Sequence, residues 1–109
     1  MALLTVEEIS RSGLQPTQTA IGGGGDTFVN DGKKTFLLFL NGVTAFTVTI
    51  VTPGTVDGLA IADRTVVIGA NEEHLIGPWP TAQYNDGSGI VSLTYSDTTD
   101  GTVSPVRLP

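Results

Sequence analysis

Residues 34–51 read KTFLLFLNGVTAFTVTIV, and this stretch indicates the fold class more strongly than any other. Phe46, Val48 and Ile50 alternate with threonines, which predicts a strand with one buried face. Before them, apolar side chains at 36–40 fall on both faces, which is typical of a central strand covered on both sides. Asn41-Gly42 between the two segments is a strong signal for a tight turn. We therefore expect a β-hairpin over residues 34–51.

Outward from this stretch, short strand patterns alternate with turn signals. Pro53-Gly54 predicts a turn, and residues 55–63 read as an irregular crossing between sheets. Pro105 cannot donate a ladder hydrogen bond, so the last strand is expected at a sheet edge. Further strand patterns lie at residues 65–68, 73–76, 90–95 and 102–108. The chain should be all-β: a single small β-sandwich or jelly-roll-like barrel of about seven or eight antiparallel strands.

The first sixteen residues differ from the rest and are interpreted as an N-terminal arm, which leaves residues 17–109 as the β-sandwich domain. Thr5-Val6-Glu7-Glu8 matches a capping box, but the residues after it support at most a turn or two of helix. The segment carries too many apolar side chains to lie free in water, and they must pack on this domain or on a neighbour. The apolar arm residues are Leu3, Leu4, Val6, Ile9 and Leu14.

Composition excludes several classes of protein. The chain has 109 residues, enough for one domain, and no cysteine, which excludes disulfides and thiolate metal sites. Five basic against eleven acidic residues give a net charge of −6, which disfavours nucleic acid as a partner. The longest apolar run, residues 36–40, is far too short to span a membrane, and the N-terminus lacks a basic leader. We expect a protein that binds neither nucleic acid nor membranes.

The sequence offers no catalytic, metal or cofactor motif. His74 is the one histidine, and it is expected to be a strand residue with its ring partly in solvent. Glu72 and Glu73 are adjacent and would point to opposite faces of a strand, so they do not form a carboxylate pair. The turns rich in Asn, Asp and Gly have the chemistry of ordinary turns. We expect no enzyme activity, no metal site and no cofactor.

Trp79 and Tyr84 are open to two interpretations. As surface aromatics they would form a platform on which sugars stack, as in a carbohydrate-binding sandwich. The prolines on either side of Trp79 favour instead a packed corner that closes one end of the sandwich. A low charge content, threonine-rich strands and an apolar arm favour binding to other proteins by shape and strand addition.

Several turn and corner segments resemble a group of short β-rich proteins that tailed double-stranded-DNA bacteriophages encode among their head genes. The resemblance runs from about Leu14 to Leu108. It is carried by residues 12–17, 25–33, 52–60, 63–64, 75–80 and 84–85.

This resemblance implies a virion structural protein, a head decoration or cement protein that binds the outer surface of the assembled capsid and braces neighbouring major capsid subunits. It also implies that the arm residues engage the capsid, that the protein is a homo-oligomer, with a trimer as one form, and that it is assembled in the host cytoplasm. Lys33-Lys34 and the two-sided apolar strand 36–40 depart from the group. The alternatives are a head–tail connector or tail component, and, in another class, a carbohydrate-binding module.

Overall fold

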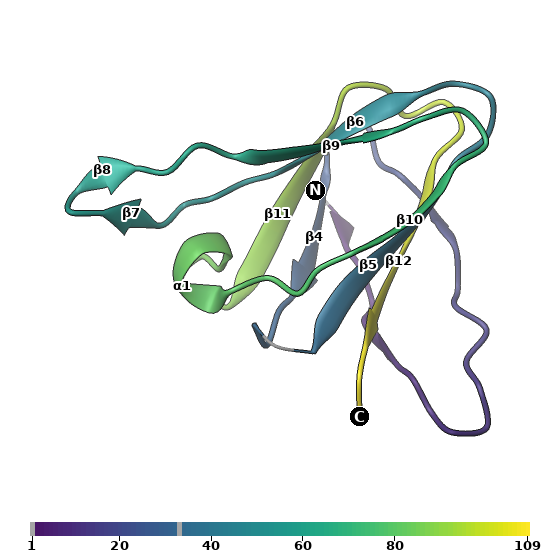
Figure 1. The fold of residues 1–109 in the computed structure, drawn as a ribbon, viewed down its shortest axis with the longest axis horizontal. Helices are drawn as coiled ribbons and strands as arrows, with labels where there is room; N and C mark the ends of the chain where they lie inside the picture. Colours follow the sequence, from purple (N-terminus) through teal and green to yellow (C-terminus); the bar gives the residue numbers. More distant parts are fainter. Residues whose placement is uncertain (1, 33) are drawn as a thin grey trace.

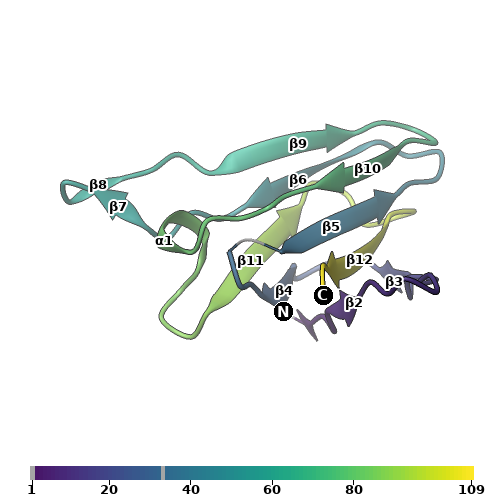
Figure 2. The same ribbon diagram turned by 60° about the horizontal axis from the view of Figure 1, so that its bottom comes forward.

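The computed structural model describes residues 2–32 and 34–109, and at Ala2 and Val56 it describes the backbone alone. Met1, the first residue of the predicted arm, and Lys33, the first of the Lys33-Lys34 pair, lie outside the described residues. Two five-stranded sheets pack face to face, and the predicted all-β sandwich is confirmed (Figures 1 and 2). Sheet A has the order β1 (Ala2–Leu3), β4 (Asp26–Val29), β11 (Ile90–Tyr95), β6 (Phe46–Ile50), β9 (Arg64–Ile68). Sheet B has the order β10 (Glu73–Ile76), β5 (Thr35–Leu40), β12 (Thr102–Arg107), β2 (Glu7–Glu8), and β3 (Thr19–Ala20) also pairs with β12.

The remaining elements are short. β7 (Thr55–Val56) and β8 (Leu59–Ala60) form a two-stranded sheet, and α1 (Thr81–Tyr84) is a single helical turn. Among the described residues, seven strands have four to six residues, and every pairing between those seven is antiparallel, as predicted. The expectation of a wholly antiparallel fold is wrong only at the arm, because β1 runs parallel to β4 and β2 runs parallel to β12.

The hairpin predicted over residues 34–51 does not form. β5 lies in sheet B and pairs with β10 and β12, whereas β6 lies in sheet A and pairs with β9 and β11. The chain between them is an arch that crosses from one sheet to the other. Both strands were placed correctly, but their apolar faces meet across the core, where the rings of Phe39 and Phe46 pack edge to face at 6.0 Å.

Asn41 explains why its Asn-Gly pair makes an arch. Its side-chain amide donates to the carbonyl oxygens of Thr44, Ile68 and Gly69 at 2.9, 3.1 and 3.0 Å. Gly42 keeps φ outside the left-handed region that a type I′ hairpin turn requires. The Asn41 side chain therefore connects the arch to the end of β9 instead of closing a two-residue turn.

The segment expected to be an irregular crossing, residues 55–63, contains a hairpin, β7–β8, that projects from the sandwich (Figures 1 and 2). The chain reverses at Asp57 and Gly58, whose φ values are 52° and 77°, and not at Pro53-Gly54 as predicted. Two successive positive φ values define the type I′ turn for which Asp-Gly is a preferred pair. We refer to residues 55–60 as the finger.

β12 lies inside sheet B, so its predicted place at a sheet edge is wrong. The amide of Leu108 donates to the carbonyl oxygen of Lys34 beside β5. Since alternate residues of a strand direct their amides to opposite neighbours, Pro105 directs its nitrogen away from β5. On that side β3 pairs at 102–103 and β2 pairs at 106–107, which leaves Pro105 in the gap between them.

The core lies between the sheets and is built by the inward residues of alternating strands. In β6 the predicted alternation is confirmed, with buried apolar residues separated by half-buried threonines. The aromatic rings of Phe39, Phe46 and Tyr95 pack edge to face on one another at 6.0 to 6.4 Å. Besides Phe39, the fully buried apolar residues are Phe28, Leu37, Val48, Ile50, Ile68, Val91, Leu93 and Val103.

Candidate protein-binding surface

The arm residues predicted to contact a partner are divided between the core and the surface. Leu4 is buried at 6% exposure within the core, and Val6 packs against the core. Ile9 and Leu14 are half-buried, and Leu3 is exposed at 61%. Leu4 and Val6 are therefore occupied within their own molecule, and of the five predicted residues only Leu3 presents most of its surface to a partner.

The arm closes one side of the sandwich. β1 is the last strand of sheet A and β2 the last strand of sheet B, so the few residues between them cross from one sheet to the other. The backbone amide of Leu4 donates to Thr27 at 2.7 Å during this crossing. Residues 2–16 thus complete both sheets, and the extended backbone replaces the helical turn that the capping-box pattern predicted.

Trp79 and Tyr84 are not surface aromatics. Trp79 is 3% exposed and Tyr84 is 7% exposed, and their rings pack edge to face at 5.3 Å. The segment between Pro78 and α1 holds them against the core, as the packed-corner interpretation predicted. No flat aromatic face remains at these two positions for a sugar to stack on.

Four apolar side chains lie on the outer side of sheet B, on its two neighbouring strands β5 and β10. Phe36, Leu38 and Leu40 alternate with the core residues of β5 and are half-buried. Leu75 of β10 stands opposite Leu38 and is 64% exposed. We call these four residues the β5 face. The sequence pattern showed that β5 is apolar on both sides, but it did not show that Leu75 extends the patch.

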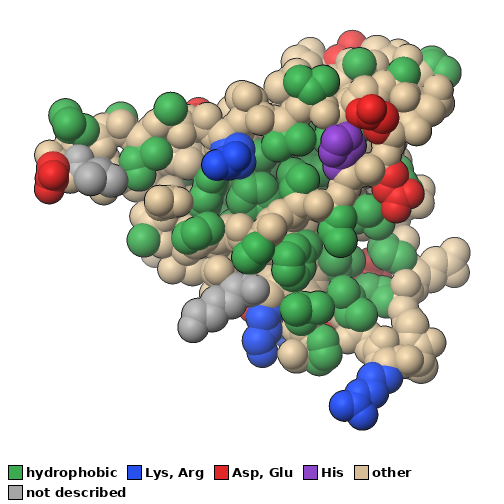
Figure 3. Space-filling view, in the orientation of Figure 1, with side chains coloured by type: hydrophobic (Ala, Val, Ile, Leu, Met, Phe, Trp, Pro, Cys, Tyr) green, Lys and Arg blue, Asp and Glu red, His purple; other side chains and the backbone are tan. Residues whose placement is uncertain are grey.

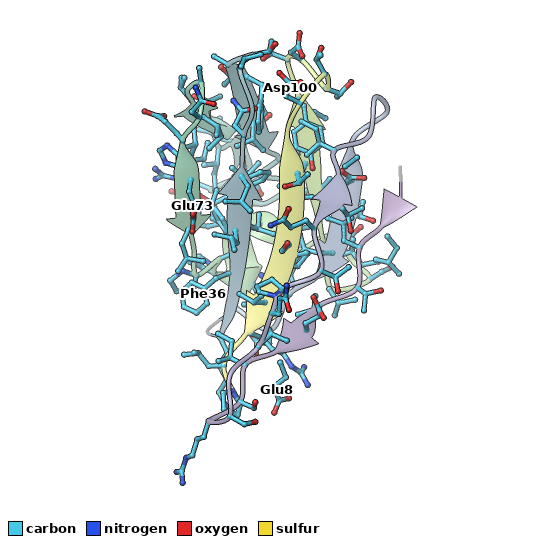
Figure 4. The ribbon with its side chains drawn as sticks, turned by 90° about the vertical axis from the view of Figure 1, so that its right-hand side faces the viewer. Glu8, Phe36, Glu73 and Asp100 are labelled. Carbon is cyan, nitrogen blue, oxygen red and sulfur yellow. The ribbon has the colours of Figure 1, made fainter. Side chains whose placement is uncertain are left out.

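The β5 face is left uncovered by the rest of the described chain. The neighbouring outer side of β12 is covered: Ser104 is 1% exposed and donates to the carbonyl oxygen of Thr17, and Val106 is 5% exposed. Figure 4 shows that the segments next to β2 and β3 pass over β12 and leave β5 and β10 open. Glu73 stands at the rim of this face, opposite Leu40.

A groove opens between the two sheets on the side opposite the arm. There β9 ends sheet A and β10 ends sheet B, and within the described residues no further strand pairs with either edge. The groove has a volume of about 460 Å³ and is lined by Arg64, Val66, Ile76, Trp79 and Tyr84, among others. Hydrophobic side chains gather on this face between β9, β10 and α1 in Figure 3. We call it the edge groove.

Arg64 is the one charged side chain among the described residues that line the edge groove. Its Nε donates to the Tyr84 hydroxyl at 3.3 Å, and its remaining guanidinium N–H groups have no partner within residues 2–32 and 34–109. A guanidinium held in this way presents a fork of donors suited to a carboxylate. The groove therefore combines apolar walls with one basic group.

His74, Glu72 and Glu73, the titratable residues singled out in the sequence, lie at the start of β10. His74 is half-buried on β10, as expected, and its Nε2 lies 3.1 Å from Oε1 of Glu72. The hydrogen bond with His74 has the larger effect and the one from the Gly69 amide the smaller, and both hold the pKa of Glu72 below its ordinary value. Across the described residues, no group of three or more His, Cys, Asp or Glu side chains could hold a metal ion. No helix in that part of the chain is long and apolar enough to cross a membrane.

Comparison of the chain with protein-family models, curated protein sequences and solved structures finds no match in any of the three.

Proposed function

We propose that the protein is a non-enzymatic head decoration protein of a tailed double-stranded-DNA bacteriophage. It binds the outer surface of the assembled capsid and braces neighbouring major capsid subunits. The resemblance of its turn and corner segments to phage head proteins supports the class of protein. The β5 face, four apolar side chains on the uncovered part of sheet B, is the observation that carries the mode of binding.

The β5 face has the character of a protein interface. Its centre is apolar, Glu73 stands at its rim, and the rigid sheet beneath presents the side chains at fixed spacing. An uncovered patch of this kind on a small domain marks a binding surface. A low charge content, 15% of residues, also limits the repulsion between many copies on one shell. We place the capsid contact here instead of at the arm, because Leu4 and Val6 serve the core.

Bracing follows from linkage. A protein that binds the assembled shell, and not its separated subunits, stabilises the shell by a free energy that grows with the logarithm of its concentration over Kd. Contacts with two neighbouring subunits at once add to this, because the two subunits cannot then separate without breaking at least one of those contacts. No covalent chemistry is needed at any step.

The experiment is co-sedimentation of purified protein with capsids assembled without it. Leu75→Lys places a charge in the β5 face, and Val67→Lys is its matched control. Leu75 and Val67 are 64% and 63% exposed, lie on the two edge strands β10 and β9, and belong to opposite outer faces. We expect Leu75→Lys to weaken capsid binding at least tenfold and Val67→Lys to bind like the natural protein. Equal binding by the two variants would contradict the β5 face as the contact.

Copy number in the same experiment tests the alternative within the virion. A decoration protein saturates at many copies spread over the shell, whereas a head–tail connector or tail component saturates at a single ring. Absence of any binding to capsids or virions would reject the proposed function as a whole. The carbohydrate-binding alternative has no structural support at Trp79 and Tyr84, which are buried.

A further inference from the structure

We propose that the finger of one copy of this protein docks in the edge groove of a second copy. This self-association is measured without capsids, so its failure leaves the proposed function standing. It rests on three features of the described residues: a hairpin that projects without support, an open edge of the sandwich, and complementary groups on the two.

The finger is too small to be stable on its own. Its strands pair at two positions only, Thr55 with Ala60 and Val56 with Leu59. A two-stranded hairpin is marginally stable in water even when it is longer than this. The finger nevertheless exposes an apolar side chain, Leu59, at 72%. A projecting hairpin with an exposed leucine gains most by packing against another surface.

The base of the finger is held firmly, which aims it away from its own groove. The amide of Gly54 donates to the carbonyl oxygen of Gln83, and a Cβ at Gly54 would lie 2.5 Å from the carbonyl oxygen of Ala82. On the other strand, Asp63 accepts hydrogen bonds from the amide and the hydroxyl of Thr52 at 2.9 and 3.0 Å. The finger therefore extends beyond α1 (Figures 1 and 2), where a second molecule can receive it.

The edge groove lies at the side of the sandwich opposite the arm, which adds a strand to the edge of each sheet. The arm closes the sandwich between β4 and β12, whereas in residues 2–32 and 34–109 no further strand pairs with β9 or β10. Val66 and Ile76 face this opening and are only half-buried. An extended or hairpin segment from another chain would cover these side chains and could pair with a free strand edge.

The finger and the edge groove carry side chains of opposite charge, which favours the finger as the segment that docks there. The Asp57 side chain at the tip is exposed and makes no hydrogen bond or ion pair with the described residues. The groove offers the Arg64 guanidinium, whose free N–H groups suit a carboxylate. Leu59 and Asp57 lie two residues apart. One docked finger would therefore place a leucine against the apolar side chains of the groove and a carboxylate beside Arg64. In a chain with a net charge of −6, Arg64 is a basic group that favours an acidic side chain as its partner.

The first test measures the Kd of self-association by sedimentation velocity over a range of concentrations. Leu59→Ser removes the apolar contact. Val43→Ser, on the arch, is the control, because Val43 is an apolar side chain of similar exposure, 78% against 72% for Leu59. We expect Leu59→Ser to raise Kd at least tenfold, since it removes most of the apolar surface that docking would bury at this position, and Val43→Ser to leave it unchanged. A protein that stays monomeric at about 100 μM, where weak specific association is detectable, would overturn the inference. So would equal effects of the two variants.

A double-mutant cycle tests the ion pair. Asp57→Asn keeps a residue that tolerates the positive φ of the turn, and Arg64→Gln removes the guanidinium. Each single change should raise Kd about two- to fivefold, the range for an exposed ion pair, and the double variant should do no more than either. Multiplying effects would show that the two groups do not meet. Arg11→Gln, in the arm, is the control for loss of one positive charge, and circular dichroism checks that each variant folds.

Disulfide trapping gives a direct readout because the chain has no cysteine of its own. A Leu59→Cys variant mixed with an Ile76→Cys variant should form a mixed covalent dimer under mild oxidation. Leu59→Cys mixed with Val43→Cys should form far less. Equal yields from the two mixtures would reject docking of the finger in the groove.

Discussion

The hydroxyl of Tyr95 donates a 2.8 Å hydrogen bond to the carboxylate of Asp26, which is 1% exposed between the two sheets. The same oxygen of Asp26 accepts the backbone amide of Gly22 at 3.1 Å, which holds the glycine-rich turn before β4. A buried carboxylate needs such donors, since burial without them is costly. This pair therefore connects the aromatic cluster of the core to the start of β4.

Tyr95→Phe should lower the free energy of unfolding by about 1.5–3 kcal/mol, the range for a hydrogen bond to a charged group. The ring and its contacts with Phe39 and Phe46 remain, so the loss reports the hydroxyl alone. Urea unfolding followed by the fluorescence of the buried Trp79 measures it. A change within about 0.5 kcal/mol, typical of a surface substitution, would show that the hydrogen bond contributes little.

Stability should also fall at alkaline pH because of the same residue. Burial first, and then the hydrogen bond to Asp26, raise the pKa of Tyr95 above its ordinary value. The phenol in the unfolded chain ionises near pH 10 while the folded one stays neutral, so ionisation favours the unfolded state as the pH rises further. Below the unfolded pKa the group has no effect on the pH dependence. Above it, the free energy of unfolding should fall by at most about 1.4 kcal/mol per pH unit from this group. The fall should be shallower in Tyr95→Phe, and parallel curves would contradict the assignment.

Leu4 and Leu3 should respond very differently to truncation although they are neighbours. Leu4→Ala removes a side chain that is 6% exposed and should lower the free energy of unfolding by about 2–5 kcal/mol. Leu3→Ala, at 61% exposure, should change it by less than about 0.5 kcal/mol. Thermal or urea unfolding of the two variants measures the difference. Equal small effects would mean that the arm is not part of the fold, and deletion of the arm would then be a clean test of partner binding.

At neutral pH, replacing Asn41 by aspartate should lower the free energy of unfolding more than replacing it by alanine. Asn41→Ala loses the side-chain amide whose two N–H groups are shared among three carbonyl oxygens and should cost about 1–3 kcal/mol. Asn41→Asp keeps the shape but points an ionised carboxylate at three carbonyl oxygens, so its destabilisation at pH 7 should exceed that of Asn41→Ala. Lowering the pH should narrow the gap as the carboxylate is protonated. The reverse order at pH 7 would show that Asn41 does not donate to the arch.

Gly101 should not tolerate a side chain. A Cβ there would lie 2.6 Å from Cε1 of Phe46 and 2.8 Å from Cδ1 of Ile21, both within the packed core. Gly101→Ala should therefore cost about 1–3 kcal/mol through overpacking. Gly23→Ala, where no atom lies within 4 Å and φ is not positive, should be neutral or stabilise by up to about 1 kcal/mol. Melting temperatures of the two variants give the comparison.

The local amino-acid pattern was sufficient to predict those features that depend only on residues close together in the chain. Alternation placed β6, and strand-forming runs placed β5, β9, β10 and β11 within a residue or two. It also showed that Trp79 belongs to a corner. An Asp-Gly pair between Val56 and Leu59 was an available signal for the finger, but Pro53-Gly54 three residues earlier drew the turn assignment instead. The place of Leu75 in the β5 face had no such local signal, because Leu75 and Leu38 lie on strands that are far apart in the chain.

Amino-acid pattern alone therefore specified which segments are strands and which of their faces are apolar, since side-chain alternation is a property of each strand by itself. Only the folded molecule determined which strands pair, because an apolar strand face can be buried equally well by a hairpin partner or by the opposite sheet. At Asn41 a side-chain amide that binds the distant carbonyls of Ile68 and Gly69 favoured the arch. The same long-range choice left the β9 and β10 edges open and the finger unsupported.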